Sequence, residues 1–400
     1  MSRAIVSLNA GSSSIKFALF VLAGDGPSRV ASGKLEGIGT APHLAARDLN
    51  GDVLVDRTWD GGADLDHEAL LQDLFAWAGA HLEGREIVGL GHRVVHGGGR
   101  FTAPVRVDDQ VLTALEAFCP LAPLHQPHNL AAIRAIQTLA PELPQVACFD
   151  TAFHHQMPEI ATRFALPRAL HDKGVRRYGF HGLSYDYIAR TLGQIDPDLA
   201  RGRVIMAHLG NGASLCAMHD GKSLDTTMGF TALDGLVMGT RCGAVDPGVV
   251  LHLLSQEGMS IAEVERLLYT QSGLLGVSGV SSDMRTLHQS QDPRAAEAID
   301  LFAWRVAREV GGLISSLAGL DGLVFTAGIG ENDPAIRALI CQRLAWAGIV
   351  IEPAANQANA ALISTPASKV AVRVMATDEE RMIALQTIST LGLNAQGRAP

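Results

Sequence analysis

Several short stretches of the chain carry side chains that could bind a phosphoryl group. The first, Leu8–Lys16, places three consecutive serines after Gly11 and ends on a lysine. Gly11 permits a backbone turn with positive φ, and the serine hydroxyls, the backbone N–H groups and Lys16 suit the oxygens of a phosphoryl group. A β-hairpin with an ordinary polar turn explains the same residues. The interpretation therefore depends on what the rest of the chain supplies.

A second stretch places an arginine in apolar surroundings. The run Gly91-His92-Arg93-Val94-Val95-His96-Gly97 reads as a strand. Its two histidines are four residues apart, but no glutamate follows His92, so the zinc-protease pattern is absent. A buried arginine needs an anion to offset the loss of hydration. That anion is either a bound substrate or the partner in a structural ion pair.

Three further polar residues, Asp150, His181 and Arg241, are candidates for a functional role. Asp150 follows the short apolar strand Gln145–Phe149, and open α/β sheets place chemistry at such strand ends. It could equally be a helix cap or a turn residue. His181 lies between glycines before the expected helix Leu183–Leu192, where a lone histidine is more often structural than catalytic. Arg241 lies in the glycine-bounded loop 238–243.

A strand followed by Gly-x-Gly-x-Asn suggests a nucleotide site. The strand Leu323–Thr326 runs into Gly328–Asn332, after which Asp333 can cap a helix that has Pro334 in its first position. Free N–H groups and a positive helix end would then face a bound anion. A single Gly-x-Gly is weak evidence. The Walker A motif is absent, because Gly221-Lys222-Ser223 has no glycine at position 216.

The chain is expected to end with a strand, 369–376, and a helix, 379–391. Thr377-Asp378-Glu379-Glu380 fits the spacing of a capping box with Thr377 as N-cap and Glu380 at the third helical position. Glu379 is then either a favourable charge in the first turn or a metal ligand.

Periodicity indicates the elements that must position these residues. Strands are expected at the start of each half of the chain. The hairpins 6–14 and 206–214 have the same order of parts: a strand, a turn of small residues with Asn and Gly, and a second strand. Two halves of one fold that offer similar hairpins to a shared cleft would explain the likeness. Pro120–Asn129 is interpreted as an irregular loop. Helices are expected over 66–82, 108–118, 130–139, 248–255 and 293–317.

Composition indicates a soluble, cytoplasmic globular protein of two or three domains. The 400 residues are 47% hydrophobic, and the net charge of −9 with no Lys/Arg-rich run argues against nucleic acid or an anionic membrane as partner. The five cysteines form no CxxC pair, which is typical of reduced thiols. No signal peptide and no apolar run of about 20 residues is present.

Taken together, the motifs resemble those of the acetate kinase (acetokinase) family over essentially the whole chain. The resemblance rests on stretches that occur in the same order as in the family: 8–16, 91–98, 150–154, 177–182, 208–212, 238–241, 328–332 and 378–380. It implies an acetate kinase, an ATP:acetate phosphotransferase that forms acetyl phosphate and ADP reversibly by direct in-line transfer. The implied fold is α/β, a duplicated actin-like ATPase (ribonuclease H-like) fold of two domains with mixed sheets flanked by helices and a central cleft.

The resemblance also implies domains, partners and residue roles. The domains would be 1–150 plus 377–400, and 151–376, the latter carrying the nucleotide and the contact of a homodimer. Mg²⁺, with Mn²⁺ as a substitute, would be held by Asn9 and Glu379, largely through water. Catalysis would use Arg93, Asp150, His181 and Arg241, with Arg93 binding the carboxylate. The acyl pocket would be formed by Arg93, Val95, Leu124, Phe180 and Ala232. The ATP site would be lined by Lys16, Ser12, Ser14, His208, Leu209, Gly210, Asn211, Gly212, Asp283, Met284, Arg285, Gly328, Ile329, Gly330, Glu331 and Asn332.

The chemistry agrees with these residue types. A carboxylate nucleophile is already ionised at neutral pH, so the obstacle is bringing one anion up to another. Two arginines, a histidine, a lysine and Mg²⁺ supply the positive charge that phosphoryl transfer requires. Asp150 is expected to orient an arginine or the metal's waters more than to move protons.

Departures from the family pattern concern specificity. Where the family commonly has Thr-Pro-Leu-Glu-Gly, this chain has Thr231-Ala232-Leu233-Asp234-Gly235. Loss of the proline ring would widen the acyl pocket by roughly two methylenes, each worth about 0.8 kcal/mol of burial. A kinase of propionate or another short carboxylate is therefore the nearest alternative. An Hsp70-like ATP-binding module without a carboxylate substrate, and a phosphatase, are alternatives of other classes.

Overall fold

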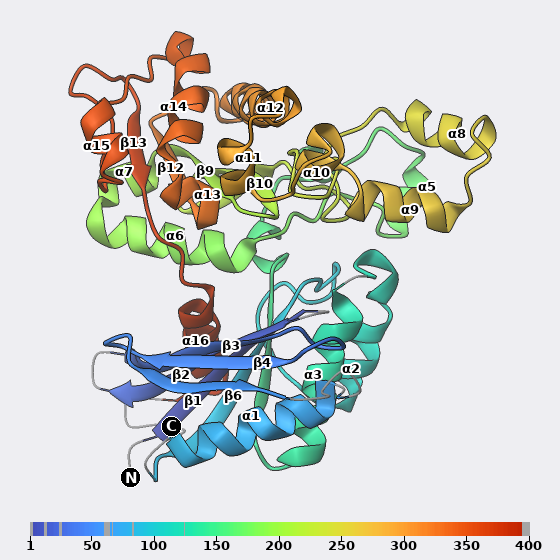
Figure 1. Ribbon diagram of the computed structural model, residues 1–400, viewed down its shortest axis with the longest axis vertical. Coiled ribbons are helices and arrows are strands. Elements are labelled where there is room, and N and C mark those ends of the chain that lie inside the picture. The colour runs from blue at the N-terminus through green and yellow to red at the C-terminus, as the bar shows by residue number, and fades with distance from the viewer. Residues whose placement is uncertain are drawn as a thin grey trace. The chain divides into compact units, whose positions relative to one another are not determined.

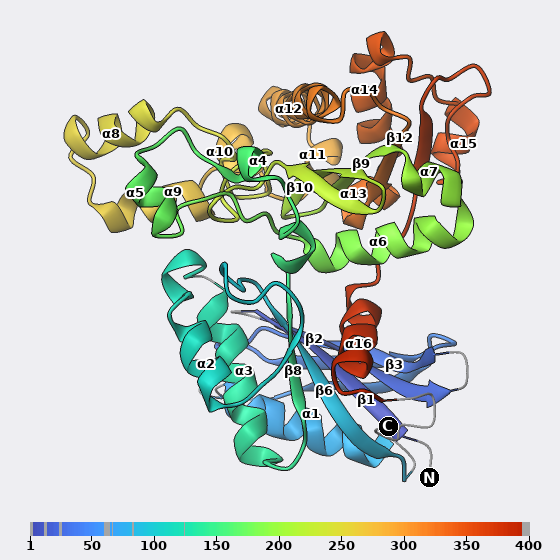
Figure 2. The same ribbon diagram turned by 180° about the vertical axis from the view of Figure 1, so that it is seen from behind.

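The computed structural model describes residues 3–11, 14–23, 26–59, 65, 67–81, 84–123 and 125–393. It divides into two compact units, Met1–Ala152 with Asp378–Pro400, and Phe153–Thr377. Figures 1 and 2 show both units as ribbons. Each is an α/β unit built on its own sheet.

Among the described residues, unit 1 contains an eight-stranded mixed sheet in the order β5-β4-β3-β2-β1-β6-β8-β7. Strand β1 pairs antiparallel with β2 and parallel with β6, and β6 pairs parallel with β8. The strands are β1 Arg3–Ala10, β2 Ser14–Ala23, β3 Gly26–Glu36, β4 His43–Asp48, β5 Val53–Thr58, β6 Glu86–Val94, β7 Val105–Arg106 and β8 Gln145–Phe149. The helices are α1 His67–His81, α2 Asp109–Glu116, α3 Gln126–Leu139 and α16 Glu379–Thr390, with a 3₁₀ turn η2 at Cys119–Leu121.

Helices cover both faces of the unit 1 sheet. Apolar side chains of α1 and α3 pack with Val6, Leu8 and Phe17 on one face. On the other face Ala384 of α16 packs with Ile5 and other buried strand residues. Figure 2 shows α16 and α3 beside the central strands β6 and β8. The parallel strands β1, β6 and β8 therefore end together at one well-supported edge.

Two expectations for this unit were wrong at helix starts. The irregular loop expected over Pro120–Asn129 already contains the first turn of α3, which begins at Gln126. A proline in the first turn removes an N–H that has no helical partner there anyway, so the helix tolerates it. At α16 the N-cap is Asp378, whose carboxylate accepts from the Arg381 N–H at 2.9 Å, and the expected capping box on Thr377 is absent.

In the described part of unit 2 the sheet has five strands, in the order β11-β10-β9-β12-β13. The strands are β9 Arg203–Leu209, β10 Ala213–His219, β11 Lys222–Thr226, β12 Gly322–Thr326 and β13 Ala371–Val374. The longer helices are α6 Gly182–Ile195, α8 Pro247–Ser255, α9 Ile261–Thr270, α12 Pro293–Leu317 and α14 Pro334–Arg343. The shorter ones are α4 Glu159–Thr162, α5 Arg168–Asp172, α7 Pro197–Arg201, α10 Gly273–Ser278, α11 Met284–Gln289, α13 Ala327–Asn332 and α15 Pro353–Gln357, with 3₁₀ turns at Ala152–His154 and Ala345–Ala347.

The two sheets repeat one topology. The order β3-β2-β1-β6-β8 corresponds to β11-β10-β9-β12-β13, with the same alternation of antiparallel and parallel neighbours. In unit 2, α6 covers one face and α12 packs against β9, β10 and β11 (Figure 1). The internal duplication expected from the two hairpins is thus confirmed. Within the described residues, no helix has the length and apolar character needed to cross a membrane.

A buried arginine fixes the loop after β12. Arg337 of α14 is fully buried, and its N–H groups donate to oxygens of Asn356, Asn359, Gly330 and Glu331 at 2.5–2.9 Å. These acceptors are neutral amide and carbonyl oxygens. Burial lowers the pKa of Arg337, and the nearby Asp333 acts in the opposite direction. The guanidinium thereby ties the carbonyl end of α13 to α15 and the loop after it.

We expect Arg337→Met to lower the free energy of unfolding by about 3 kcal/mol, because it leaves several buried acceptors without donors. Urea denaturation followed by circular dichroism would measure the change. The matched control is Arg201→Met, which removes an exposed arginine paired with Asp198 and should change stability by less than about 0.5 kcal/mol. Equal effects of the two substitutions would contradict this role of Arg337.

Candidate active site

The carboxyl ends of three neighbouring strands bring Asn9, Arg93 and Asp150 together in unit 1. Arg93 Nε and Nη2 donate to Asp150 Oδ2 at 3.0 and 2.6 Å, and Arg93 Nη1 donates to Asn9 Oδ1 at 3.1 Å. The Asp150 side chain is 2% exposed and that of Arg93 20% exposed. The ion pair expected as one alternative for Arg93 is present. A guanidinium has five N–H groups, so two hydrogens beyond these bonds can serve a further oxygen ligand.

An acidic cluster surrounds this arginine. Burial alone would lower the pKa of Arg93, but Asp150, Glu379 and Glu380 raise it above its ordinary value. Burial also raises the pKa of Glu380, and the adjacent carboxylates of Glu379 and Asp378 add to this, while Lys16 opposes it. Lys16 stands opposite Asn9 in the β1–β2 pair. Asp378 also forms an ion pair with Arg29, so the carboxylates around the first turn of α16 lie among several cations.

The oxygen donors at this edge fit a divalent cation of the Mg²⁺ type. Asn9 and Glu379 offer an amide and a carboxylate oxygen, the ligand types that hard cations prefer. The described residues contain no group of three or more His, Cys, Asp or Glu side chains able to hold a metal directly. Mg²⁺ usually binds few protein ligands directly and keeps several of its water molecules.

Two amide side chains that the sequence reasoning missed hold this edge in place. Asn129 of α3 accepts from the Val95 N–H at 3.0 Å and donates to the Ala10 carbonyl. Gln126 accepts from the His96 N–H at 3.0 Å. The segment after β6 and the start of the Gly11 turn are therefore tied to one helix. The signal was present in the sequence, because residues 126 and 129 are amides three apart at a helix start.

Other candidates in this unit have simpler roles or lie outside the described residues. His92 is buried, its Nε2 lies 2.6 Å from Gln145 Oε1, and burial lowers its pKa to about 4, so it serves the core. The Gly11 N–H donates to the Ser14 carbonyl at 2.8 Å, which closes the turn between β1 and β2. Ser12 and Leu124 lie outside the described residues.

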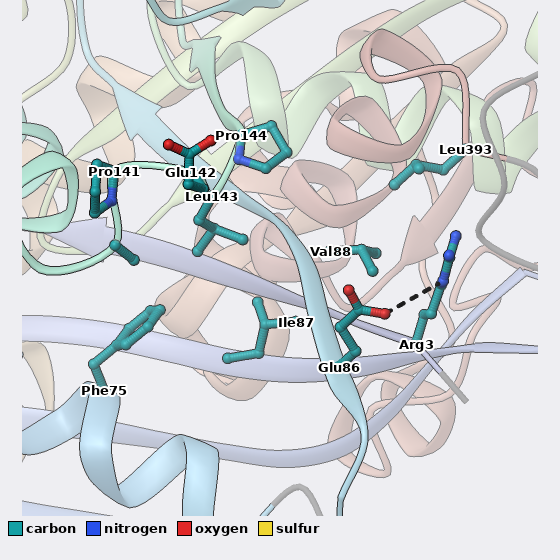
Figure 3. Close-up of a pocket in the computed structure, with 11 residues that line it drawn as sticks. Arg3, Phe75, Glu86, Ile87, Val88, Pro141, Glu142, Leu143, Pro144 and Leu393 are labelled. Carbon is teal, nitrogen blue, oxygen red and sulfur yellow. Dashed lines mark ion pairs between the residues drawn. The ribbon is translucent and has the colours of Figure 1, made fainter. Parts of the chain in front are cut away.

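Figure 3 shows a separate pocket of about 600 Å³ at the other end of these strands. It is lined in part by Arg3 and Glu86, the first residues of β1 and β6. Asn9 and Arg93 are instead the last residues but one of the same two strands. The remaining lining is mostly apolar and includes Phe75, Ile87 and Leu143. It is therefore distinct from the Arg93 edge.

In unit 2 a second constellation surrounds the Gly210–Gly212 turn between β9 and β10. An ideal Cβ on Gly212 would lie 2.7 Å from Arg241 Nη2 and 3.2 Å from His181 Nε2, so both side chains reach this turn. Arg241 also donates to the Ala232 carbonyl at 2.7 Å. The Gly239 N–H donates to the Asn211 carbonyl at 3.0 Å, which joins the Arg241 loop to the turn.

His181 has an unusual backbone for a residue with a side chain. It has φ 59° and ψ 23° immediately before α6, in the left-handed region that costs energy for most residues. Its ring stacks on His208 of β9, with centroids 4.1 Å apart. Phe180, beside it, is buried, and its carbonyl is 2.9 Å from His154 Nε2. The structure therefore brings His181, His208 and Arg241 to one turn.

A cavity of about 810 Å³ in unit 2 adjoins this turn. Eight of the residues expected at the ATP site line it: Gly210, Asn211, Asp283, Met284, Arg285, Gly328, Ile329 and Asn332. His208, Leu209, Gly212, Gly330 and Glu331 are not part of its lining. Glu331 instead turns back on its own strand end, where Oε1 accepts from the Ala327 and Thr377 N–H groups at 2.8 and 3.0 Å. This position indicates that Glu331 supports the loop after β12.

The helix caps around the cavity follow from local sequence. Asp283 caps α11 by accepting from the Arg285 and Thr286 N–H groups, and the Arg285 side chain lowers the pKa of this carboxyl. Asp333 caps α14 as expected, accepting from the Ile336 N–H at 3.0 Å with Pro334 in the first turn. Gly328–Asn332, expected as an open turn, is instead part of the short helix α13.

Comparison with known proteins decides the family. The model of the acetokinase family matches residues 4–385. The chain belongs to the acetokinase family. An acetate kinase of Rhodopseudomonas palustris is 51% identical over 389 residues, which cover 96% of this chain and 97% of that protein.

Solved structures of this family share the fold. The acetate kinase of Porphyromonas gingivalis superposes with a TM-score of 0.87 at 39% identity, covering 97% of this chain and all of that one. A propionate kinase of Francisella tularensis gives a TM-score of 0.90 at 40% identity, covering 97% and 99%. The duplicated actin-like α/β fold expected for this acetokinase is thereby confirmed.

Proposed function

We propose that the protein is an acetate kinase, which transfers the γ-phosphoryl group of ATP to acetate and forms acetyl phosphate and ADP. The observation that carries the proposal is Arg93, within a chain of the acetokinase family. Asn9 and Asp150 hold its guanidinium at the end of β6 with N–H groups to spare. Planar guanidinium donors match the two oxygens of a carboxylate.

The residue roles follow from charge. Arg93 binds and orients the acetate, and Asp150 fixes Arg93. His181 and Arg241, which meet at the Gly212 turn, donate hydrogen bonds to the oxygens of the transferring phosphoryl group. The 810 Å³ cavity of unit 2 receives the nucleotide. Asn9 and Glu379 hold Mg²⁺, largely through water, and the ion neutralises phosphate charge when bound.

The direct test is an acetate-dependent assay with Mg-ATP in which hydroxylamine traps acetyl phosphate as the hydroxamate. Arg93→Ala should lower kcat/KM for acetate by between about 10²- and 10⁴-fold, because it removes about 3–5 kcal/mol of transition-state stabilisation. The matched control is Arg100→Ala, which removes a guanidinium that lies over the ring of Phe101. ATP hydrolysis indifferent to every carboxylate would overturn the proposal and favour an ATP-binding module or phosphatase.

A preference for propionate is the second candidate. It is favoured by Ala232 in place of a proline and by the structural likeness to the Francisella propionate kinase. Ala232 also positions Arg241 through its carbonyl, which a proline would retain. A change of pocket size at this residue can therefore be tested without removing that bond.

Ala232→Pro should shift the ratio of kcat/KM for acetate to that for propionate in favour of acetate by about tenfold, the value of roughly two methylenes of lost space. Initial rates with both carboxylates would measure the ratio. Ala244→Glu, which changes a residue three positions after Arg241 in the chain, is the control and should alter the rates with both substrates alike. An unchanged ratio in Ala232→Pro would remove residue 232 from the acyl pocket.

We also propose that the protein is a cytoplasmic homodimer assembled through unit 2. Its five cysteines are free, as expected in a reducing compartment. Unit 2 exposes apolar side chains at Val249, Leu251 and Ile261 on α8 and α9. Light scattering should give twice the chain mass, and a monomer at micromolar concentration would contradict this assembly.

A further inference from the structure

The two stacked histidines of unit 2 each contact a serine hydroxyl. His181 Nδ1 lies 2.8 Å from Ser214 Oγ, and His208 Nδ1 lies 2.8 Å from Ser184 Oγ. Ser214 and Ser184 are fully buried. The equal distances make the two pairs alike, but among the contacts of the described residues Ser214 alone has a second hydroxyl beside it. Its Oγ lies 2.6 Å from the hydroxyl of Tyr185.

Tyr185 keeps its proton and must place it on an acceptor. Its side chain is fully buried on the first turns of α6, and burial raises its pKa well above the ordinary value. A backbone hydrogen bond from His208 also reaches this hydroxyl. Within the described part of the chain, the oxygen placed to accept the Tyr185 proton is Ser214 Oγ. A buried hydroxyl hydrogen without an acceptor costs about 1–3 kcal/mol, so Tyr185 donates to Ser214.

The direction of the remaining hydrogen bond follows by counting hydrogens. Since Ser214 Oγ accepts from Tyr185, its own hydrogen needs an acceptor, and the described contacts offer His181 Nδ1. If Nδ1 carried a hydrogen instead, that hydrogen and the Ser214 hydrogen would point at one another, or one of the hydroxyls would lose its acceptor. A nitrogen that accepts carries no hydrogen, so neutral His181 bears its hydrogen on Nε2.

We propose that Tyr185 and Ser214 are positioning residues that set His181 as the neutral tautomer with its hydrogen on Nε2. That atom faces the Gly212 turn beside Arg241, where an ideal Cβ on Gly212 would be 3.2 Å from Nε2. The hydrogen is therefore presented to an anionic oxygen at this turn. This role rests on the proposed function, in which the oxygen belongs to the transferring phosphoryl group.

The neighbours of His181 also favour its neutral form. His208 stacks on one face at 4.1 Å, and the Arg241 guanidinium reaches the same turn. A second proton on His181 would add a positive charge beside a permanent cation and would break the order of the hydroxyl chain. His181 then acts as a fixed neutral donor, while Arg241 supplies the charge.

The experiment reads the ring nitrogens of His181 in the full-length protein by ¹⁵N NMR after histidine labelling, with the signals assigned by their loss in His181→Gln. Protonated and unprotonated ring nitrogens resonate far apart, so the tautomer is read directly. We expect the Nε2–H tautomer in the unaltered protein. Observation of the Nδ1–H tautomer or of the imidazolium at neutral pH would overturn the proposal whether or not the protein phosphorylates acetate.

Kinetics of Ser214→Ala test the consequence. We expect kcat to fall by between about tenfold and a hundredfold, with KM for ATP and acetate changed by less than about twofold. This fall is smaller than the roughly 10²–10³-fold loss for removal of a transition-state donor, because the His181 ring remains and only its orientation is lost. The Nε2–H signal should broaden or be replaced. Tyr185→Phe, which retains the ring, should give the same change in smaller degree, and it serves as the second variant if Ser214→Ala does not fold.

Ser184→Ala is the matched control, since it removes the same hydroxyl at the same distance from the other histidine. It should leave the His181 nitrogen signals in place, and any kinetic change should appear in KM for ATP, because the family resemblance assigns His208 to the ATP site. Equal effects of Ser184→Ala and Ser214→Ala on the His181 signals would show that both serines contribute only to packing, and would overturn the proposal. Loss of phosphotransfer in every form, with the tautomer as expected, would instead count against the proposed function.

Discussion

The ion pair between Arg93 and Asp150 is the constraint on which unit 1 depends. The positive charge of Arg93 at the carboxyl end of a buried strand must be offset by a nearby negative charge. Asp150, which directly follows the neighbouring strand β8, does so by accepting two hydrogen bonds at one oxygen. This ion pair requires a strand order in which β6 lies between β1 and β8, and the same order places Asn9, near the end of β1, within reach of Arg93. Helix α16, from the far end of the chain, completes the surroundings with Glu379 and Glu380. A site of this charge density exists only because three parallel strands end at one edge.

The duplicated topology gives each unit one such edge, and the two edges have diverged in chemistry. In unit 1 the hairpin β1–β2 offers an amide and a lysine beside carboxylates, which suits a cation and a carboxylate held by arginine. In unit 2 the hairpin β9–β10 offers glycines and His208, and the side chains of His181 and Arg241 reach its turn from the start of α6 and from the 238–243 loop. A cavity large enough for a nucleotide adjoins this turn. One element is encoded apart from the rest of its unit: α16, which follows the last strand of unit 2, covers the sheet of unit 1. Unit 1 is therefore complete only once the whole of unit 2 has been encoded.

Local patterns in the sequence predicted the elements well, because period and capping are local properties. The strand 145–149 and the helix 293–317 have the expected bounds. The Asp333 cap and the start of α16 at Glu379 were predicted correctly. Helix α3 began four residues earlier than expected, at Gln126, and the N-cap of α16 is Asp378 instead of Thr377. Side-chain partners that depend on tertiary contact could not be predicted. Nothing near Ser214 in the chain indicates Tyr185, and nothing near Arg337 indicates Asn356 and Asn359.

The buried polar groups of the two units show two solutions to the same electrostatic problem. Arg93 retains its charge because a carboxylate and an amide oxygen surround it, and the cost of burial is offset by strong, charge-assisted bonds. His181 avoids a charge altogether, because a chain of two hydroxyls consumes the lone pair of Nδ1 and leaves a single hydrogen to offer. A neutral donor carries no charge to be desolvated, so His181 can lie 8% exposed beside Arg241 at little cost. An anion arriving at the Gly212 turn would then meet one permanent cation and one oriented dipole, so the site need not be assembled against repulsion between two cations in the absence of ligand.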